Sequence, residues 1–211
     1  PISEHGVTLL NDHPDITADF IPDLGSQPDK LLEIIGDYDA LIVRSQTKPN
    51  AEVIARASRL RAIGRAGVGV DNIDREAASA HGVIVMNTPT GNTVSTAEHA
   101  FALMLATARN IAPAHAGVLA GDFKNSRKAF SGIEMNGKRL AVIGLGRIGS
   151  EFVKRAQGFN MKVVAFDPFL TQARADELKI ELADSPDAVL DGADVVTLHV
   201  PLTDDTRHII N

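Results

Sequence analysis

Residues 141–149 read AVIGLGRIG, and this stretch decides the fold of the chain. An apolar strand is predicted over Leu140–Ile143 before it, and an amphipathic helix over Arg147–Gln157 after it. In that setting Gly144 permits a tight turn, Gly146 lets a pyrophosphate approach the backbone, and Gly149 lets the helix pack close to the strand. The spacing therefore predicts a dinucleotide-binding turn, in which the N–H groups at the start of the helix face anionic phosphates.

An acidic residue at the end of the next strand completes this pattern. The strand is predicted over Lys162–Phe166, and Asp167 ends it, 18 positions after Gly149. A carboxylate there can accept hydrogen bonds from the adenosine ribose and would repel a 2′-phosphate, which favours NAD over NADP. The alternative is a glycine-rich turn of another α/β fold, with Asp167 as a helix-capping acid. The alternative is disfavoured because strand, glycines, helix and acid all stand in register.

Short apolar runs alternate with helical segments along the whole chain, which is typical of parallel sheets with helices on both faces. The predicted strands are Val7–Leu10, Ala40–Val43, Leu60–Ile63, Val83–Met86, Leu140–Ile143, Lys162–Phe166 and Val195–Val200. The predicted helices include Asp29–Ile35, Ala51–Ala57, Asp74–Ala80 and Arg147–Gln157. The fold class predicted from this order is α/β.

One long apolar segment, Ser95–Ile111, interrupts the alternation. It is predicted to be a helix that begins with a capping box of Ser95 and Glu98. Because apolar residues lie nearly all round it, the helix is expected to be buried between domains or in a subunit contact. A domain boundary is placed just before it, which divides the chain into residues 1–92 and 93–211. Residues 111–137 are expected to form a helix tail and an irregular connection.

A second glycine-rich loop follows the strand near residue 60, and Gly64–Asn72 reads GRAGVGVDN. Its glycines are not spaced for a dinucleotide, but its bare backbone suits a small anion such as a carboxylate. Arg44 and Arg65 each follow a predicted strand, at the sheet edge where ligands bind in parallel α/β folds. Together they predict a site for a small substrate with more than one negative charge. Solvated surface charge is the other interpretation of each arginine alone.

Composition excludes several other classes of function. The formal net charge of −6 argues against a nucleic-acid or membrane-surface role, because either would favour a basic face. The absence of Cys excludes disulfides and thiol chemistry and fits a cytoplasmic location. None of the seven His residues stands at a metal-ligand spacing, so no metal site is predicted. No apolar run is long enough to predict a membrane span.

Five segments together resemble the D-isomer-specific 2-hydroxyacid dehydrogenases, and within them the phosphoglycerate dehydrogenase branch. The segments are Gly64–Asp74 (GRAGVGVDNID), Val85–His99 (VMNTPTGNTVSTAEH), Gly137–Ser150 (GKRLAVIGLGRIGS), Val163–Phe169 (VVAFDPF) and Val196–Thr206 (VTLHVPLTDDT). The resemblance implies a flavodoxin-like substrate-binding domain over residues 1–92 and an incomplete Rossmann NAD-binding domain over 93–211. It also implies a cytoplasmic homodimer or tetramer that oxidises D-3-phosphoglycerate to 3-phosphohydroxypyruvate with NAD, the entry to serine biosynthesis.

Site residues are carried over by the same resemblance onto matching positions. Those expected at the substrate, a small anionic 2-hydroxy acid, are Arg44, Arg65, Gly67 and Gly69. Those expected at NAD are Val68, Gly144, Gly146, Arg147, Ile148, Gly149, Asp167, His199, Val200 and Pro201.

The family's catalytic Arg, Glu and His follow the segment that matches Val196–Thr206, and this sequence ends at Asn211. The resemblance therefore implies that no catalytic residue is present in the chain. The chain itself is expected to bind NAD weakly and to be inactive. Two alternatives stay open: another D-2-hydroxyacid dehydrogenase, such as a glyoxylate or hydroxypyruvate reductase or a D-lactate dehydrogenase, and a non-catalytic NAD-sensing interaction module.

Overall fold

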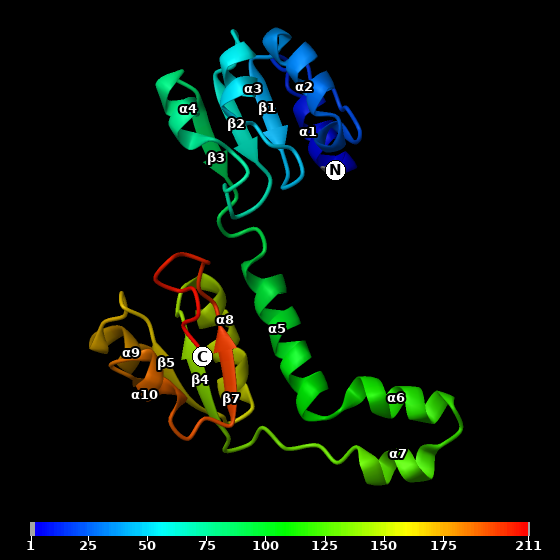
Figure 1. Ribbon diagram of the computed structural model, residues 1–211, viewed down its shortest axis with the longest axis vertical. Coiled ribbons are helices and arrows are strands. Elements are labelled where there is room, and N and C mark those ends of the chain that lie inside the picture. Colours follow the sequence, from blue (N-terminus) through cyan, green and yellow to red (C-terminus); the bar gives the residue numbers. More distant parts are fainter. Residues whose placement is uncertain (1–2, 211) are drawn as a thin grey trace. The chain divides into compact units, whose positions relative to one another are not determined.

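The computed structural model describes residues 3–210 and divides the chain into two compact units, Pro1–Asn92 and Thr93–Asn211 (Figure 1). In the first unit the helices are α1 (Glu4–Asn11), α2 (Pro28–Ile34), α3 (Ala51–Arg56) and α4 (Arg75–Ala80). Short 3₁₀ turns lie at Leu24–Ser26 and Ile35–Asp37. Its strands are β1 (Ala40–Val43), β2 (Ala62–Arg65) and β3 (Ile84–Asn87).

The three strands of the first unit form a parallel sheet in the order β1-β2-β3. Side chains from α2, α3 and α4 share one core with the inward-facing positions of the sheet, such as Val43 and Ile63. On the opposite face Ile42, Ile84 and Met86 are exposed. Among residues 3–92, therefore, helices are packed on one face of this sheet, whereas the sequence predicted helices on both faces.

The predicted strand Val7–Leu10 is wrong, because these residues lie within helix α1. The side chain of Ser3 accepts a hydrogen bond from the Gly6 amide and so caps the helix. A serine cap of this kind satisfies an amide that the helix itself leaves unpaired. The short apolar run did not distinguish a helix from a strand, because three apolar residues fit either period.

The second unit has a four-stranded parallel sheet in the order β6-β5-β4-β7. Its strands are β4 (Arg139–Ile143), β5 (Lys162–Phe166), β6 (Glu181–Leu182) and β7 (Val195–Leu198). Its helices are α5 (Thr93–Ala108), α6 (Ile111–Leu119), α7 (Phe123–Ala129), α8 (Arg147–Gly158), α9 (Gln172–Leu178) and α10 (Pro186–Leu190). Because β5 and β6 lie on one side of β4 and β7 on the other, the order has the switch point of a Rossmann fold beside β4. This confirms the predicted α/β class with parallel sheets.

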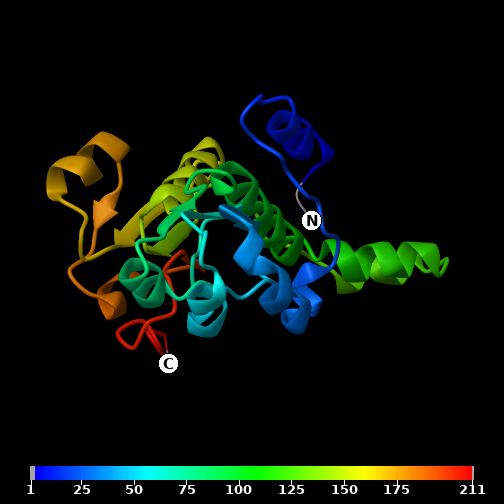
Figure 2. The same ribbon diagram turned by 90° about the horizontal axis from the view of Figure 1, so that it is seen from above.

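Strand β4 is the centre of the second unit and is buried on both faces. Leu140 and Val142 point into a core shared with α5, α8 and α9, whereas Ala141 and Ile143 point into a second core with α10. A strand covered on both faces must be apolar at every position, which is why the segment runs continuously apolar rather than alternating. Helices α5 and α8 run side by side in both views (Figures 1 and 2), and Arg155 of α8 pairs with Glu98 of α5 at 2.9 Å.

The segment after the domain boundary differs from its prediction in two respects, the start of the helix and the connection that follows it. Helix α5 begins at Thr93, so Ser95 lies inside its first turn and not at its N-cap as predicted, and Glu98 pairs with Arg155. Within the described chain α5 buries Ala97 and Phe101 and exposes Val94 and Leu103, and its expected burial between domains or in a subunit contact stays a prediction. The predicted irregular connection is a helical hairpin of α6 and α7 (Figure 1).

Helix α6, in the segment predicted as a helix tail and an irregular connection, buries none of its side chains in the described chain. A helix shows a clear apolar stripe only where one face is packed and the other is solvated. Within residues 3–210, no helix has the length and apolar character that crossing a membrane requires.

Candidate cofactor and anion sites

Three strands of the second unit end at the same level beside the switch point. The register pairs Ile143, the last residue of β4, with Phe166 of β5 and with Leu198 of β7. The next residues, Gly144, Asp167 and His199, therefore stand together at the carboxyl edge of the sheet. This is the edge at which ligands bind in open parallel sheets.

The three glycines of the predicted phosphate turn have three different surroundings. A Cβ on Gly144 would lie 2.7 Å from the His199 carbonyl oxygen, and the φ of 89° at Gly144 strains any other residue. A Cβ on Gly149 would lie 2.3 Å from the Gly144 carbonyl oxygen. A Cβ on Gly146 would meet no atom within 4 Å. Gly144 and Gly149 are thus required by packing within the protein, whereas Gly146 borders open space.

Helix α8 begins at this open space. Gly146 is its N-cap and makes no side-chain capping bond, and Gly146 and Arg147 are both exposed. The start of an α-helix has backbone N–H groups that need acceptors and a partial positive charge, so it suits an anion. Ile148, the next residue, packs its partly buried side chain on the core and holds the helix start in place. The turn therefore fits a dinucleotide pyrophosphate.

Asp167 bonds the phosphate turn itself. One carboxylate oxygen accepts from the Leu145 amide at 2.7 Å, and the other accepts from the Phe169 amide at 2.9 Å. Each oxygen of an ionised carboxylate can accept more than one hydrogen bond, so both retain capacity for ribose hydroxyls. Its predicted sugar contact stays a prediction, and the structure adds a bond that fixes the turn.

His199 and Val200 close the turn from the side of β7. The His199 amide donates to the Ile143 carbonyl at 2.8 Å, and its ring packs against Phe152 with centroids 5.3 Å apart. The Nε2 atom lies 3.1 Å from the Thr197 hydroxyl. Val200 packs on the core beneath β4, and Pro201, which follows it, is exposed. His199 and Val200 therefore lie against Gly144 and hold the backbone of the turn in place.

The predicted anion-binding residues lie at the carboxyl edge of the first unit's sheet. The register places Val43, Arg65 and Asn87 side by side as the last residues of their strands, and Arg44 directly follows β1. The Arg65 guanidinium lies over Gly67, where a Cβ would be 1.6 Å from Nη1. The Nε atom of Arg65 is buried and has no hydrogen-bond partner among the described residues.

Gly69 and Val68 belong to the same loop as Gly67. A Cβ on Gly69 would lie 2.7 Å from an Asp71 carboxylate oxygen, so the glycine leaves room for that side chain. Val68 is partly buried, and its carbonyl accepts a hydrogen bond from Asn87 at 2.6 Å. Its expected position near the nicotinamide stays a prediction.

Comparison with known proteins now decides the family. The sequence profile of the D-isomer specific 2-hydroxyacid dehydrogenase NAD-binding domain matches residues 101–211, more than half of the chain. The chain belongs to the D-isomer-specific 2-hydroxyacid dehydrogenases. The predicted membership and the NAD cofactor are thereby confirmed, and the assignment of the turn at Gly144–Gly149 to the phosphates stays a prediction.

Relatives in this dehydrogenase family match the whole chain. It is 46% identical over its full length to a D-3-phosphoglycerate dehydrogenase of Methanocaldococcus jannaschii and covers 39% of that protein. Over 94% of its length it is 43% identical to the D-3-phosphoglycerate dehydrogenase of Bacillus subtilis, of which it covers 37%. The chain thus spans between a third and two fifths of these curated relatives.

Solved structures of the family agree with the fold. A Thermus thermophilus protein matches with a TM-score of 0.79 and 33% identity over 92% of this chain and 59% of that one. D-lactate dehydrogenase from Aquifex aeolicus, solved with NAD and lactic acid, matches with a TM-score of 0.75 and 29% identity. That match covers 85% of this chain and 53% of the lactate dehydrogenase chain.

Partial burial lowers the pKa of His199 below its ordinary value of 6.5, so we expect the second unit to lose stability in mild acid. The unfolded chain binds a proton near pH 6.5 while the folded chain still resists it. The free energy of unfolding is therefore not reduced by His199 above about pH 6.5. It falls as the pH drops from there toward the lower pKa that His199 has in the folded chain. Urea unfolding between pH 7.5 and 5.5 should show a steeper loss for the wild type than for His199→Gln. Equal slopes for the two proteins would contradict a neutral, partly buried His199.

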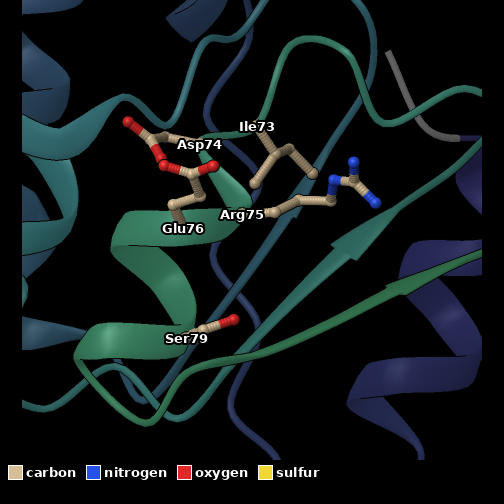
Figure 3. Close-up of a pocket in the computed structure, with 5 residues that line it drawn as sticks. All are labelled: Ile73, Asp74, Arg75, Glu76 and Ser79. Atoms are coloured by element: carbon tan, nitrogen blue, oxygen red, sulfur yellow. The ribbon is translucent and has the colours of Figure 1, made fainter.

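A hollow at the start of α4 suits a ligand less well than the turn at Gly144–Gly149 or the loop beneath Arg65 (Figure 3). Asp74 caps α4 by accepting from the Ala77 amide at 2.9 Å, so its carboxylate already has a structural use. Asp74 and Glu76 lie on one side of the hollow and Arg75 points away from them. No group of three or more potential metal ligands occurs in the described part of the chain.

Sequence reasoning missed two asparagines beside the predicted anion-binding residues. Asn72 and Asn87 bond to the loops that follow β1 and β2. Asn87 directly follows the predicted strand Val83–Met86, and Asn72 ends the glycine-rich loop, so position alone could have drawn attention to them. Their partners lie 19 to 28 residues away, which no local pattern reveals.

Proposed function

We propose that the complete protein oxidises D-3-phosphoglycerate to 3-phosphohydroxypyruvate with NAD. Two kinds of observation support this. Relatives named D-3-phosphoglycerate dehydrogenase are 43–50% identical to the chain. The edge of the first unit's sheet has two arginines beside a bare backbone loop, which suits a substrate with both a carboxylate and a phosphate.

The observation that carries the proposal is the position of Arg65. Its guanidinium is folded over Gly67, and its buried Nε–H has no acceptor among the described residues. A buried donor without an acceptor costs free energy, so an incoming anionic oxygen would relieve that cost. Arginine can also hold a carboxylate or phosphate through two parallel hydrogen bonds. Arg44, exposed at the end of β1, would supply the second cation.

The chain's residues bind and orient in this proposal. NAD, when bound, supplies the hydride acceptor for the substrate carbon that is oxidised. The turn at Gly144–Gly149 and the start of α8 would hold its pyrophosphate, and Asp167 would hold its ribose. Arg44 and Arg65 would fix the two anionic ends of the substrate, which sets the orientation of its hydroxyl-bearing carbon.

Replacing Arg44 with Ala in the complete protein tests the substrate class. A lost charge-assisted hydrogen bond is worth about 1.5–3 kcal/mol, so KM for D-3-phosphoglycerate should rise roughly 10- to 100-fold. KM for a monoacid such as D-lactate, if it is turned over, should change much less. Steady-state NADH formation with both substrates measures the difference.

Arg59→Ala is the matched control, because Arg59 lies in the same unit but pairs with Asp39 in an exposed ion pair. It should leave both KM values unchanged. A wild-type preference for D-lactate or glyoxylate, with equal effects of Arg44→Ala on all substrates, would contradict the phosphate assignment and favour another dehydrogenase of the family. NAD binding without turnover of any 2-hydroxy acid would favour an NAD-sensing module.

The same proposal includes a role in serine biosynthesis in the cytoplasm and a homodimer or tetramer. The exposed apolar residues of the α6–α7 hairpin, Ile111, Val118, Leu119 and Phe123, support self-association through the second unit.

The 211-residue chain assayed alone is expected to form no NADH. The resemblance places the acid–base histidine after the segment that matches Val196–Thr206.

A further inference from the structure

The loops that follow β1, β2 and β3 are bonded to one another at the carboxyl edge of the first unit's sheet. They contain Arg44, the glycine-rich loop and Thr88 respectively. The Ala66 amide donates to the Val43 carbonyl at 2.9 Å, and the Thr88 amide donates to the Gly67 carbonyl at 3.0 Å. A further bond, from the Asp74 amide to the Pro49 carbonyl at 2.9 Å, joins the far ends of the first two loops, so backbone bonds link each loop to its neighbour.

Asn72 adds a side-chain connection between the glycine-rich loop and the β1 loop. Its Nδ2 group donates to the Arg44 carbonyl at 3.0 Å and to the Thr47 carbonyl at 2.7 Å. The two N–H groups of the Asn72 carboxamide are therefore both used, on carbonyls three residues apart. These two bonds fix the path of the backbone from Arg44 to Thr47. The Oδ1 atom of Asn72 is buried without a partner among the described residues, so the carboxamide contributes here as a donor.

Asn87 makes the corresponding connection on the other side. Its Nδ2 group donates to the Val68 carbonyl at 2.6 Å, next to the Gly67 carbonyl that the Thr88 amide binds. Two consecutive carbonyls of the glycine-rich loop are thereby turned toward β3. The loop lacks side chains that could pack at Gly67 and Gly69, so these bonds supply order that glycine itself does not.

We propose that Asn72 and Asn87 are positioning residues that hold Arg44 and the Arg65–Gly67 loop in the geometry that binds the anionic substrate. This rests on the proposed function and extends it to two residues that would not contact the substrate. Long arginine side chains lose much conformational freedom on binding, and a fixed backbone beneath them reduces that loss. Asn72 acts on Arg44, and Asn87 acts on the loop over which Arg65 lies.

The effect of losing Asn72 should appear in KM. Arg44 would hold the substrate in the ground state and the transition state alike, and a loss of such uniform binding raises KM with little change in kcat. In the complete protein, Asn72→Ala should raise KM for the preferred 2-hydroxy acid about tenfold, the loss expected from about one weakened hydrogen bond. The Kd for NAD should stay within about twofold, because Asn72 lies in the other unit from the phosphate turn.

Asn72→Asp is the second variant, because it keeps the shape but places an oxygen against two carbonyl oxygens. It should raise KM at least as much as Asn72→Ala. Asn50→Asp is its matched control: it adds the same charge to the same unit and keeps the oxygen that accepts from the Val53 amide. Asn50→Asp should leave KM within about twofold, since aspartate also caps helices well.

A double-mutant cycle with Arg44→Ala separates positioning from general destabilisation. If Asn72 acts through Arg44, then Asn72→Ala should cause little further rise in KM once Arg44 is already Ala. Fully additive effects, or a fall in kcat and thermal stability with unchanged KM, would overturn the positioning role. A wild-type protein that oxidises no 2-hydroxy acid would instead overturn the proposed function on which this role rests.

Discussion

Gly146→Ala is expected to weaken NAD binding roughly 10- to 100-fold, the loss of one charge-assisted hydrogen bond of about 1.5–3 kcal/mol. The physical reason is that the added methyl group would occupy the open space above the turn, where a Cβ meets no protein atom within 4 Å. The pyrophosphate would be held away from the N–H groups at the start of α8. A titration that follows the change in NADH fluorescence on binding gives the Kd for NADH directly.

The stability of the fold should depend on the other two glycines of this turn, Gly144 and Gly149, more than on Gly146. Gly149→Ala would place a Cβ 2.3 Å from the Gly144 carbonyl oxygen, which must push α8 away from β4. Overpacking of this kind costs about 1–3 kcal/mol. Gly144→Ala combines a contact of 2.7 Å with a left-handed φ and should cost at least as much. Gly146→Ala should cost no more than about 1 kcal/mol, the usual loss at an N-cap.

Comparison of the three variants therefore separates ligand contact from packing. Thermal unfolding without NAD measures the stability of each variant, and NADH titration measures its affinity. The assignment fails if Gly146→Ala binds NADH like the wild type, or if it unfolds as readily as Gly149→Ala. Gly158→Ala is the control. A Cβ on Gly158 also meets nothing within 4 Å, but Gly158 lies at the far end of α8 from the turn.

Asp167→Asn is expected to have the second large effect, because Asp167 has two functions in this structure. Its carboxylate accepts from the Leu145 and Phe169 amides, and it is proposed to accept from the ribose hydroxyls of NAD. An amide has one acceptor oxygen where the carboxylate has two, so at least one backbone bond is lost. We expect the Kd for NAD to rise roughly 10- to 100-fold.

Discrimination against NADP should fall in the same variant, because the charge that repels a 2′-phosphate is removed. The ratio of the Kd values for NADP and NAD measures this effect separately from loop disorder, which would weaken both cofactors equally. Asp176→Asn is the matched control, since Asp176 is an acid of the same unit that bonds Gln172 on the exposed side of α9. An unchanged ratio in Asp167→Asn would contradict the proposed ribose contact.

Much of the cofactor turn could be predicted from the sequence because its determinants are local. The strand ending at Ile143, the glycines and the helix beginning at Arg147 were predicted within a residue or two. Turn chemistry depends on φ angles and on the absence of a Cβ, and both are properties of the residues themselves. Patterns without such markers were misinterpreted: the apolar run in α1 was predicted as a strand, and the α6–α7 hairpin as an irregular connection.

What the sequence by itself determined is the class of the chain: strands alternating with helices, a glycine turn shaped for a dinucleotide, and charges at strand ends. Only the tertiary structure decided which groups meet. It brought Asp167 to the Leu145 amide, laid Arg65 over Gly67 and joined Asn72 to the carbonyls of Arg44 and Thr47. The physical reason is that hydrogen bonds between strand ends depend on sheet order and register. These follow from burial of whole strands rather than from any short run of residues.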